Sequence, residues 1–200
     1  MNWYIVQAYS GFEKKVVDAV TQLIGSPAVL HLDQMFLKPG KHGIGTSWHQ
    51  DNAYFKIGNP LGGTAMWVAI HDANISNGTI CVIPGSHREK YEHFRDPNSN
   101  HHIRCQVPEK EAVPIELNAG GVAFFCYGTA HCTTRNNTDF ERAGMAFHFL
   151  RSDSASQMQD GKPLISGSSC SFGKNEYGTS QLGRWRKVYE RSCTLQLNPC

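Results

Sequence analysis

Short apolar runs separated by turn-forming residues dominate the chain from Ala28 to Leu150. The runs read AVLHL, QMFL, TAMWVAI, TICVI, AVPIEL, GVAFFCYG and RAGMAFHFL, and glycine, proline and asparagine fall between them. Short strands bounded by turn signals at roughly regular spacing are typical of all-β domains. The pattern therefore predicts a β-sandwich or β-barrel over this part of the chain.

The flanking and connecting segments carry different patterns. Residues 11–23 place apolar side chains at helical spacing and predict a short helix, whereas residues 3–8 are rich in β-formers. Asn77-Gly78 lies between two apolar runs and predicts a tight hairpin, because both residues tolerate positive φ. Residues 85–112 hold few apolar positions, so we expect a polar excursion between strands. After Leu150 the chain becomes polar and rich in serine and glycine.

Length and charge exclude several classes of function. The 200 residues suffice for one domain with a buried core. Nineteen basic against 17 acidic residues give a formal net charge of +2, which predicts neither a nucleic-acid partner nor a membrane partner. There is no run of apolar residues long enough for a transmembrane helix, and the opening residues lack the pattern of a secretory signal.

The cysteines point to a reducing compartment. There are seven, an odd number, and none form a Cys-x-x-Cys pair. This argues against a disulfide framework and against a zinc knuckle, so we expect reduced thiols in a cytoplasmic protein. Cys126 and Cys132 lie near a histidine of interest, but free cysteine usually behaves as a small buried hydrophobe. We therefore expect both to be packing residues.

A His-x-Asp pair, His49 and Asp51, follows a glycine-rich stretch. In an extended strand, residues two apart point to the same face, so both side chains can aim at one point. His131, directly after the run GVAFFCYG, is the best candidate for a third ligand. Two histidines and one carboxylate form the facial triad of non-haem Fe(II) oxygenases, with positions left for a co-substrate and O2. Alone the pair is weak evidence, because ten histidines offer many chance partners.

Arg142 strengthens the interpretation. It lies eleven residues after His131, at the start of the run RAGMAFHFL. An oxygenase that uses 2-oxoglutarate needs a cation for the distal carboxylate of that co-substrate, and arginine can bind a carboxylate through two hydrogen bonds. Taken alone, Arg142 would be interpreted as a solvent-facing residue at a strand edge. His148 alternates with Arg142 along the same run and is expected to share its face as a packing histidine.

The order of several motifs resembles one known family. HQD at 49–51, NGTICVIPGSH at 77–87, the histidine of AHCTT and the arginine of ERAGMAF follow one another along the chain. Over residues 28–165 this is similar to the phytanoyl-CoA dioxygenase family. The resemblance implies a mainly β fold, a double-stranded β-helix (cupin-like jelly roll) with short flanking helices. It also implies a dioxygenase that uses Fe(II), 2-oxoglutarate and O2, hydroxylates a C–H bond of a small organic or acyl substrate, and releases succinate and CO2.

The resemblance also implies roles for individual residues. The iron ligands of the family match His49, Asp51 and His131. Arg142 matches the 2-oxoglutarate anchor, and Thr133 matches a hydroxyl that helps to hold the same carboxylate. Further co-substrate contacts of the family fall on Lys38, Gln50 and Trp67, although Gln50 would point away from the iron if its segment were a regular strand, and Trp67 would equally suit a core position.

The opening residues resemble a different protein. WYIVQAYSGFE is similar to the start of the transcription elongation factor NusG, and the similarity ends near Val20. We therefore predict a leader segment over 1–20, an oxygenase domain over 21–165 and a C-terminal extension over 166–200. Two alternatives remain open: a metal-binding cupin without 2-oxoglutarate chemistry, and a NusG-like transcription-binding module. Succinate release that depends on 2-oxoglutarate would separate the first alternative from the oxygenase, and RNA polymerase binding would identify the second.

Overall fold

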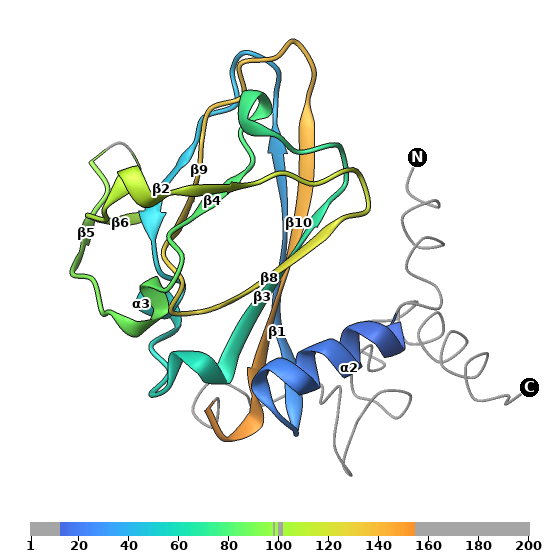
Figure 1. Ribbon diagram of the computed structural model, residues 1–200, viewed down its shortest axis with the longest axis vertical. Coiled ribbons are helices and arrows are strands. Elements are labelled where there is room, and N and C mark those ends of the chain that lie inside the picture. The colour runs from blue at the N-terminus through green and yellow to red at the C-terminus, as the bar shows by residue number, and fades with distance from the viewer. Residues whose placement is uncertain (1–12, 98, 100–101, 155–200) are drawn as a thin grey trace, which may run out of the picture. The chain divides into compact units, whose positions relative to one another are not determined.

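The protein is described by a computed structural model that covers residues 13–97, 99 and 102–154 (Figure 1). Its contacts divide the chain into two units, residues 32–148 and the segments on either side of them. None of the helices in the described part of the chain is long and apolar enough to cross a membrane. The predicted extension over 166–200 and the strand-like residues 3–8 lie outside the described residues.

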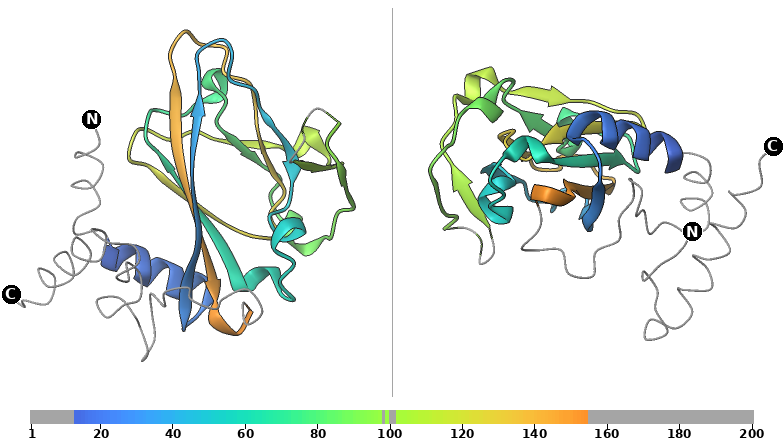
Figure 2. Two further views of the ribbon diagram at one scale, coloured as in Figure 1. Left: turned by 180° about the vertical axis from the view of Figure 1, so that it is seen from behind. Right: turned by 90° about the horizontal axis from the view of Figure 1, so that it is seen from below.

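Two four-stranded sheets dominate the structure, and the strands of each pair run antiparallel where their register is defined (Figures 1 and 2). Successive strands along the chain alternate between the two sheets, as in the predicted double-stranded β-helix, except that β4 and β7, on either side of the excursion described below, lie in the same sheet. One sheet has the order β1 (Ala28–Lys38), β10 (Arg142–Arg151), β3 (Gly63–Ala69), β8 (Val122–Cys126). The other has the order β2 (Thr46–His49), β9 (His131–Thr133), β4 (Ile80–Val82), β7 (Val113–Ile115). The prediction of a mainly β fold is therefore confirmed.

The core of the second unit lies where the apolar runs are longest. Every residue of β3 is buried, which explains why its sequence GTAMWVA is non-polar apart from Thr64 and does not alternate. A buried cluster joins this strand to its neighbours; its members are Trp67, Ala69, Ala73, Ile80 and Ala146. This packing fixes the strands whose side chains line the cavity described below.

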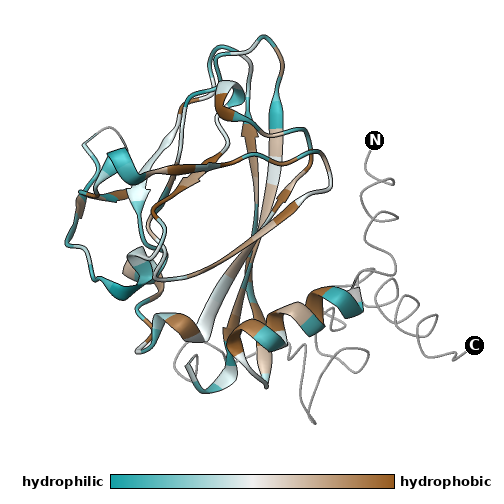
Figure 3. Ribbon diagram, in the orientation of Figure 1, coloured by the Kyte–Doolittle hydropathy of each residue, from teal (hydrophilic) through white to brown (hydrophobic). Residues whose placement is uncertain are grey.

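The first unit contains the predicted helix, α2 (Glu13–Ile24). Its turns alternate between polar and apolar residues (Figure 3), with Val20 and Ile24 buried. An exposed ion pair joins Lys14 and Asp18, one turn apart, at 3.0 Å. The helix ends at Ile24 and is followed by Gly25, whose φ of +85° suits glycine. The predicted boundary after Val20 falls inside this helix, and the domain division remains a prediction.

The region from 85 to 112 forms the predicted excursion between β4 and β7. It contains a two-stranded sheet, β5 (His93–Arg95) paired with β6 (Ile103–Cys105), and the 3-10 helices Ser86–Arg88 and Glu109–Glu111. Four further short helices occur elsewhere in the described residues: α3 (Asn52–Phe55) and 3-10 helices at Pro60–Gly62, Ile75–Asn77 and Ser152–Ser154.

The hairpin prediction at Asn77-Gly78 is wrong. Strand β3 pairs with β8, and β4 pairs with β7 and β9, so the two runs on either side of Gly78 belong to different sheets. Asn77 ends a 3-10 helix, Ile75–Asn77, and forms a capping box with Asn74. Gly78 does take the expected positive φ, +80°. The positive φ at Gly78 was correctly predicted, but the strands on either side of it pair with strands distant in the sequence rather than with each other.

Candidate metal centre and co-substrate cavity

A cavity of about 380 Å³ lies within the unit formed by residues 32–148. Both four-stranded sheets contribute to its wall, together with α3. One region of the wall carries the side chains of Lys38, Thr133 and Arg142, and another carries His49 and Asp51. Aromatic and aliphatic side chains form most of the rest: Leu32, Phe36, Tyr54, Phe55, Trp67, Ile80 and Phe125.

Sheet register brings the two candidate histidine ligands together. His49 ends β2 and His131 begins β9, and the two residues are partners across this antiparallel pair. Directly opposed residues on antiparallel strands place their side chains side by side, and the ring centroids are 4.3 Å apart. The structure thus brings together residues that lie far apart in the sequence.

Asp51 reaches the same point by a route that differs from the prediction. The expectation of an extended backbone from His49 to Asp51 is wrong: β2 ends at His49, and Asp51 has helical φ and ψ of −56° and −33° at the start of α3. The chain turns here because the backbone groups of Ala53, Tyr54 and Phe55 bond back to Gln50 and Asp51. The carboxylate still turns towards the histidines. Its Oδ1 atom lies 3.7 Å from Nε2 of both His49 and His131.

The two imidazoles are in the neutral state that a divalent metal requires of histidine ligands. His49 Nδ1 bonds the carbonyl of Ser47 at 2.8 Å, and His131 Nδ1 bonds the carbonyl of Thr129 at 3.0 Å. A carbonyl only accepts, so each Nδ1 carries the proton and each Nε2 lone pair faces Asp51. Burial lowers the pKa of each histidine to about 4, with a further contribution from His131 for His49. Both imidazoles are therefore neutral near pH 7.

The ligand atoms converge on one point and leave a carboxylate oxygen without a donor. One atom from each of His49, Asp51 and His131 lies within 4.8 Å of the others, and all three residues are buried. Burial raises the pKa of Asp51, and its Oδ2 atom has no hydrogen-bond partner among the described residues. A buried carboxylate facing two neutral imidazoles is costly without a cation. Two nitrogens and one oxygen on one side of an ion suit Fe(II).

Arg142 supplies a buried cation to the cavity. Its side chain is only 1% exposed. Nη2 donates to the carbonyl of Gly78 at 2.5 Å, and the guanidinium carbon lies 5.4 Å from the centre of the Trp67 ring. Nε has no hydrogen-bond partner in the described part of the chain. Burial lowers the pKa of Arg142 to about 10, so the group remains charged at neutral pH.

Lys38 is a second buried cation in the same cavity. Its Nζ atom donates to the hydroxyl of Thr133 at 2.8 Å and to the carbonyl of Thr134. Burial, and then the positive charge of Arg142, lower the pKa of Lys38 to about 8. Within residues 13–97, 99 and 102–154, no carboxylate forms an ion pair with either cation. Two buried positive charges without an acidic partner favour an anionic ligand.

Gln50 occupies a different place from the other predicted co-substrate residues. Its side-chain amide donates to the carbonyls of Gly128 at 2.6 Å and Glu89 at 2.8 Å, and its side-chain carbonyl accepts from the Tyr91 N–H at 3.2 Å. It is absent from the described lining of the cavity and lines a separate depression with His93. The Gln50 side chain points away from the triad, although the segment is not the regular strand on which that expectation depended, and it ties the excursion to the metal centre.

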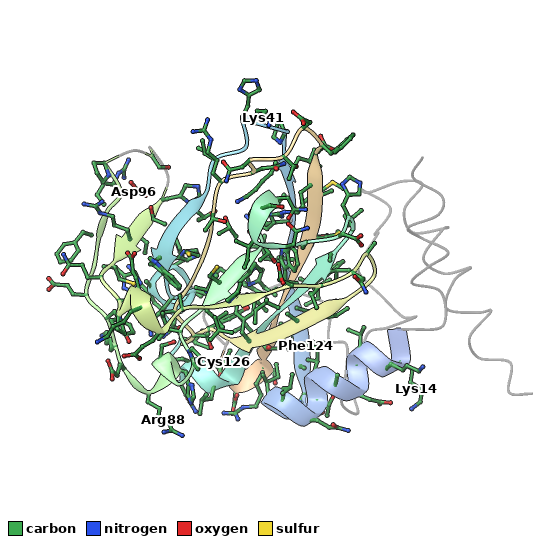
Figure 4. All side chains as sticks on the ribbon, turned by 45° about the horizontal axis from the view of Figure 1, so that its top comes forward. Lys14, Lys41, Arg88, Asp96, Phe124 and Cys126 are labelled. Atoms are coloured by element: carbon green, nitrogen blue, oxygen red, sulfur yellow. The ribbon has the colours of Figure 1, made fainter. Side chains whose placement is uncertain are left out.

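Further bonds connect the excursion to the residues around the triad. Ser47, whose carbonyl holds His49, donates through its hydroxyl to buried Asp96 at 2.5 Å. Asp96, labelled in Figure 4, belongs to the excursion. Tyr54 accepts from the backbone N–H of Ile103 at 3.0 Å and stands edge-on to the His49 ring at 5.7 Å. These contacts connect the excursion to the surroundings of His49.

Three cavity residues were not identified from sequence as functional. His148 lines the cavity on the same face of β10 as Arg142, as the alternation predicted, but its Nδ1 atom lies 3.8 Å from Asp51 Oδ2. The even spacing between Arg142 and His148 along one strand was the signal that could have placed His148 in the cavity. Tyr54 and His102 also line the cavity. His102 belongs to the excursion and Tyr54 to the short helix α3, and no local pattern indicates that either would line the cavity.

Comparisons with known proteins agree with this arrangement. The family model for phytanoyl-CoA dioxygenase (PhyH) matches residues 6–144. "Phytanoyl-CoA dioxygenase 1" of Oryza sativa subsp. japonica is 30% identical over 128 residues, 62% of this chain and 45% of the relative. "Ectoine dioxygenase" of Bordetella bronchiseptica (strain ATCC BAA-588 / NCTC 13252 / RB50) is 24% identical over 152 residues, 66% of this chain and 49% of the relative. The chain thus spans about half the length of these relatives.

Solved structures share the fold. The non-heme monooxygenase ThoJ in its apo form superposes with a TM-score of 0.69 at 23% identity, covering 90% of this chain and 74% of ThoJ. EvdO2 from Micromonospora carbonacea var. aurantiaca, complexed with 2-oxoglutarate, superposes with a TM-score of 0.64 at 23% identity. This second match covers 74% of this chain and 63% of EvdO2. At this level of identity the matches establish the double-stranded β-helix.

Proposed function

The chain belongs to the phytanoyl-CoA dioxygenase family, and from that premise we propose that it is an Fe(II)- and 2-oxoglutarate-dependent dioxygenase. The reaction would convert a C–H bond of a small organic or acyl substrate, 2-oxoglutarate and O2 into the hydroxylated product, succinate and CO2. The observation that carries the proposal is the pairing, in one cavity, of a converging His49, Asp51 and His131 set with two buried cations that have no carboxylate partner among the described residues.

Each element of the site has a separate task in this proposal. His49, Asp51 and His131 would hold Fe(II), which when bound supplies the redox chemistry that activates O2 and oxidises 2-oxoglutarate. Asp51 brings the only negative charge of the set. A carboxylate in this position favours hydroxylation, since related halogenases carry a small residue there.

The cations would bind the distal carboxylate of 2-oxoglutarate. Arg142 has Nε free of hydrogen bonds in the described structure and a guanidinium held by Gly78 and the Trp67 ring. Thr133 and Lys38, already bonded to each other, would complete the pocket for this carboxylate. Burial makes these interactions strong because little water competes for the charges. Gln50 has no part in this binding site, since its side chain bonds the backbone of the excursion.

The partner in this proposal is a small-molecule substrate, and neither nucleic acid nor a membrane is required. We also propose a cytoplasmic location. The described cysteines support it: Cys81, Cys105, Cys126 and Cys132 are free thiols, and Cys105 and Cys132 are buried as packing residues would be.

Metal and co-substrate dependence test the proposal directly. Wild type should bind Fe(II) under anaerobic conditions and, with O2, form succinate only when both Fe(II) and 2-oxoglutarate are present. Asp51→Ala should bind Fe(II) more weakly but measurably, because two imidazoles remain, and should lose succinate formation. Asp51→Asn should be intermediate in affinity, since it keeps the shape and one oxygen but loses the charge.

An exposed carboxylate provides the control. Asp139→Ala removes a side chain that is 78% exposed and pairs with Lys41, so it should match wild type in both assays. Circular dichroism establishes that each variant is folded. A folded Asp51→Ala protein with wild-type iron affinity and succinate formation would refute the triad and the function built on it.

A further inference from the structure

The three candidate ligands are not held equally well. Each imidazole is fixed by a short hydrogen bond to a backbone carbonyl two residues earlier, from His49 to Ser47 and from His131 to Thr129. Asp51 has no such support from its own segment: it stands at the N-terminus of α3, yet its side chain makes no capping hydrogen bond. Its Oδ2 atom is buried and has no hydrogen-bond partner in the described structure. The orientation of the carboxylate must therefore depend on another group.

His148 offers a polar atom placed to orient Asp51. Its Nδ1 atom lies 3.8 Å from Asp51 Oδ2, on the side of the carboxylate away from the two ligand histidines, which face Oδ1 at 3.7 Å each. His148 does not belong to the set of ligand atoms that converge within 4.8 Å. Its position therefore suits a neighbour of the metal centre rather than a fourth ligand.

Aromatic packing fixes the His148 ring. The side chain is 6% exposed. Its ring centre lies 5.3 Å from that of Phe55, at an interplanar angle of 68°, and 5.7 Å from that of Tyr127, at 52°. Phe55 and Tyr127 also contact each other at 4.8 Å. A buried ring with two aromatic neighbours has little freedom to turn. The position of His148 Nδ1 is therefore fixed, and a hydrogen bond to it would fix the orientation of the Asp51 carboxylate.

We infer that His148 is a positioning residue that holds the outer oxygen of Asp51, so that the inner oxygen faces the metal. The inference rests on the proposed function. The present separation exceeds a hydrogen bond by about 1 Å, and a small turn about χ2 of Asp51, a torsion with a broad energy minimum, is enough to close it. Groups that orient metal-ligating carboxylates and histidines typically change metal affinity by about 10- to 100-fold when they are removed.

Two substitutions separate the hydrogen-bond donor from the bulk of the ring. His148→Leu fills much of the same space and has no donor, whereas His148→Asn places an amide N–H near the present position of Nδ1. The metal affinity of each folded variant is measured with Fe(II) under anaerobic conditions and with Co(II), whose visible absorption reports the ligand geometry. His31→Leu removes another buried histidine, outside the cavity lining, and serves as the matched control.

We expect His148→Leu to bind both metals about 10- to 100-fold more weakly, with an altered Co(II) spectrum, and His148→Asn to recover most of the affinity and the wild-type spectrum. The control should resemble wild type. If His148→Leu does not fold, His148→Met, which adapts to irregular spaces and also lacks a donor, replaces it. Wild-type affinity and spectrum in the donor-free variant, or an equal loss in the asparagine variant, would overturn the inference. Failure of wild type itself to bind Fe(II) would instead reject the proposed function.

Discussion

Replacing Arg142 by methionine removes a buried charge while keeping an unbranched chain of similar length beside Trp67. In wild type this guanidinium is 1% exposed, bonds the Gly78 carbonyl and has no carboxylate partner among the described residues. Loss of one partner from a buried, hydrogen-bonded charge pair costs roughly 2–5 kcal/mol. Because each 1.4 kcal/mol is a tenfold change, the Kd for 2-oxoglutarate should rise by about 30-fold to a few thousand-fold. Lys38 remains in the cavity, so we expect the lower part of this range.

The assay is anaerobic titration of the Fe(II) form with 2-oxoglutarate, followed by succinate formation at saturating co-substrate. Arg142→Lys should fall between wild type and methionine, because lysine keeps the charge but not the two parallel N–H groups. Arg104→Met, at an exposed position on β6, controls for the loss of one positive charge. If folded Arg142→Met binds Fe(II) and 2-oxoglutarate as wild type does, another group, with Lys38 the first candidate, anchors the co-substrate.

Three further predictions concern the surroundings of the site. The pKa of Lys38 is lowered to about 8, so the lysine is protonated below pH 8 and loses its charge above it. Affinity for 2-oxoglutarate should therefore weaken as the pH rises through 8. Lys38→Met should abolish that pH dependence. At Gly144 an added Cβ would lie 2.5 Å from Trp67 Cζ2, so Gly144→Ala should displace the Trp67 ring that packs against Arg142. Separate titrations should then show 2-oxoglutarate binding weakened more than Fe(II) binding. Equal effects on both affinities would contradict this prediction. Removing residues 1–20 should leave Fe(II) binding intact, because every candidate ligand lies within residues 32–148. It should lower the melting temperature, because buried Val20 is lost from α2. Loss of metal binding in a folded truncation would count against a domain boundary at residue 20.

The regular features of the fold could be predicted because they depend on local patterns. Runs of apolar residues between turn signals indicated the strands, and helical spacing over residues 11–23 indicated α2, which spans Glu13–Ile24. The pairing of strands was not predictable in the same way. At Asn77-Gly78 the turn chemistry was right, but the strands on either side entered different sheets, because a jelly roll gains more by covering both sheets than by closing a local hairpin.

The candidate site shows the same division between local and non-local information. The residue types and their order identified His49, Asp51 and His131, yet the assumed extended backbone through Asp51 was wrong. A helical turn at Asp51 can place the carboxylate beside the histidines as well as a strand could, because metal binding depends on where the carboxylate oxygens lie and not on the backbone conformation that carries them. Nothing in the spacing could show that Gln50 would instead bond the carbonyls of Glu89 and Gly128. Those partners are 39 and 78 residues away, one in the excursion and one just after β8, and they meet Gln50 only in the folded structure.

Strand β10 links the two halves of the proposed chemistry. Arg142 lies at its start and His148 six residues later on the same face, so one rigid strand presents a cation for the co-substrate and a nitrogen beside the outer oxygen of Asp51. A shift of β10 would move both groups together, whereas a shift of β2 or β9 would move the ligand histidines relative to them. Substitutions that displace β10 should therefore weaken metal and co-substrate binding in parallel. Changes at the His49–His131 pair should affect the metal first, and co-substrate binding only through it.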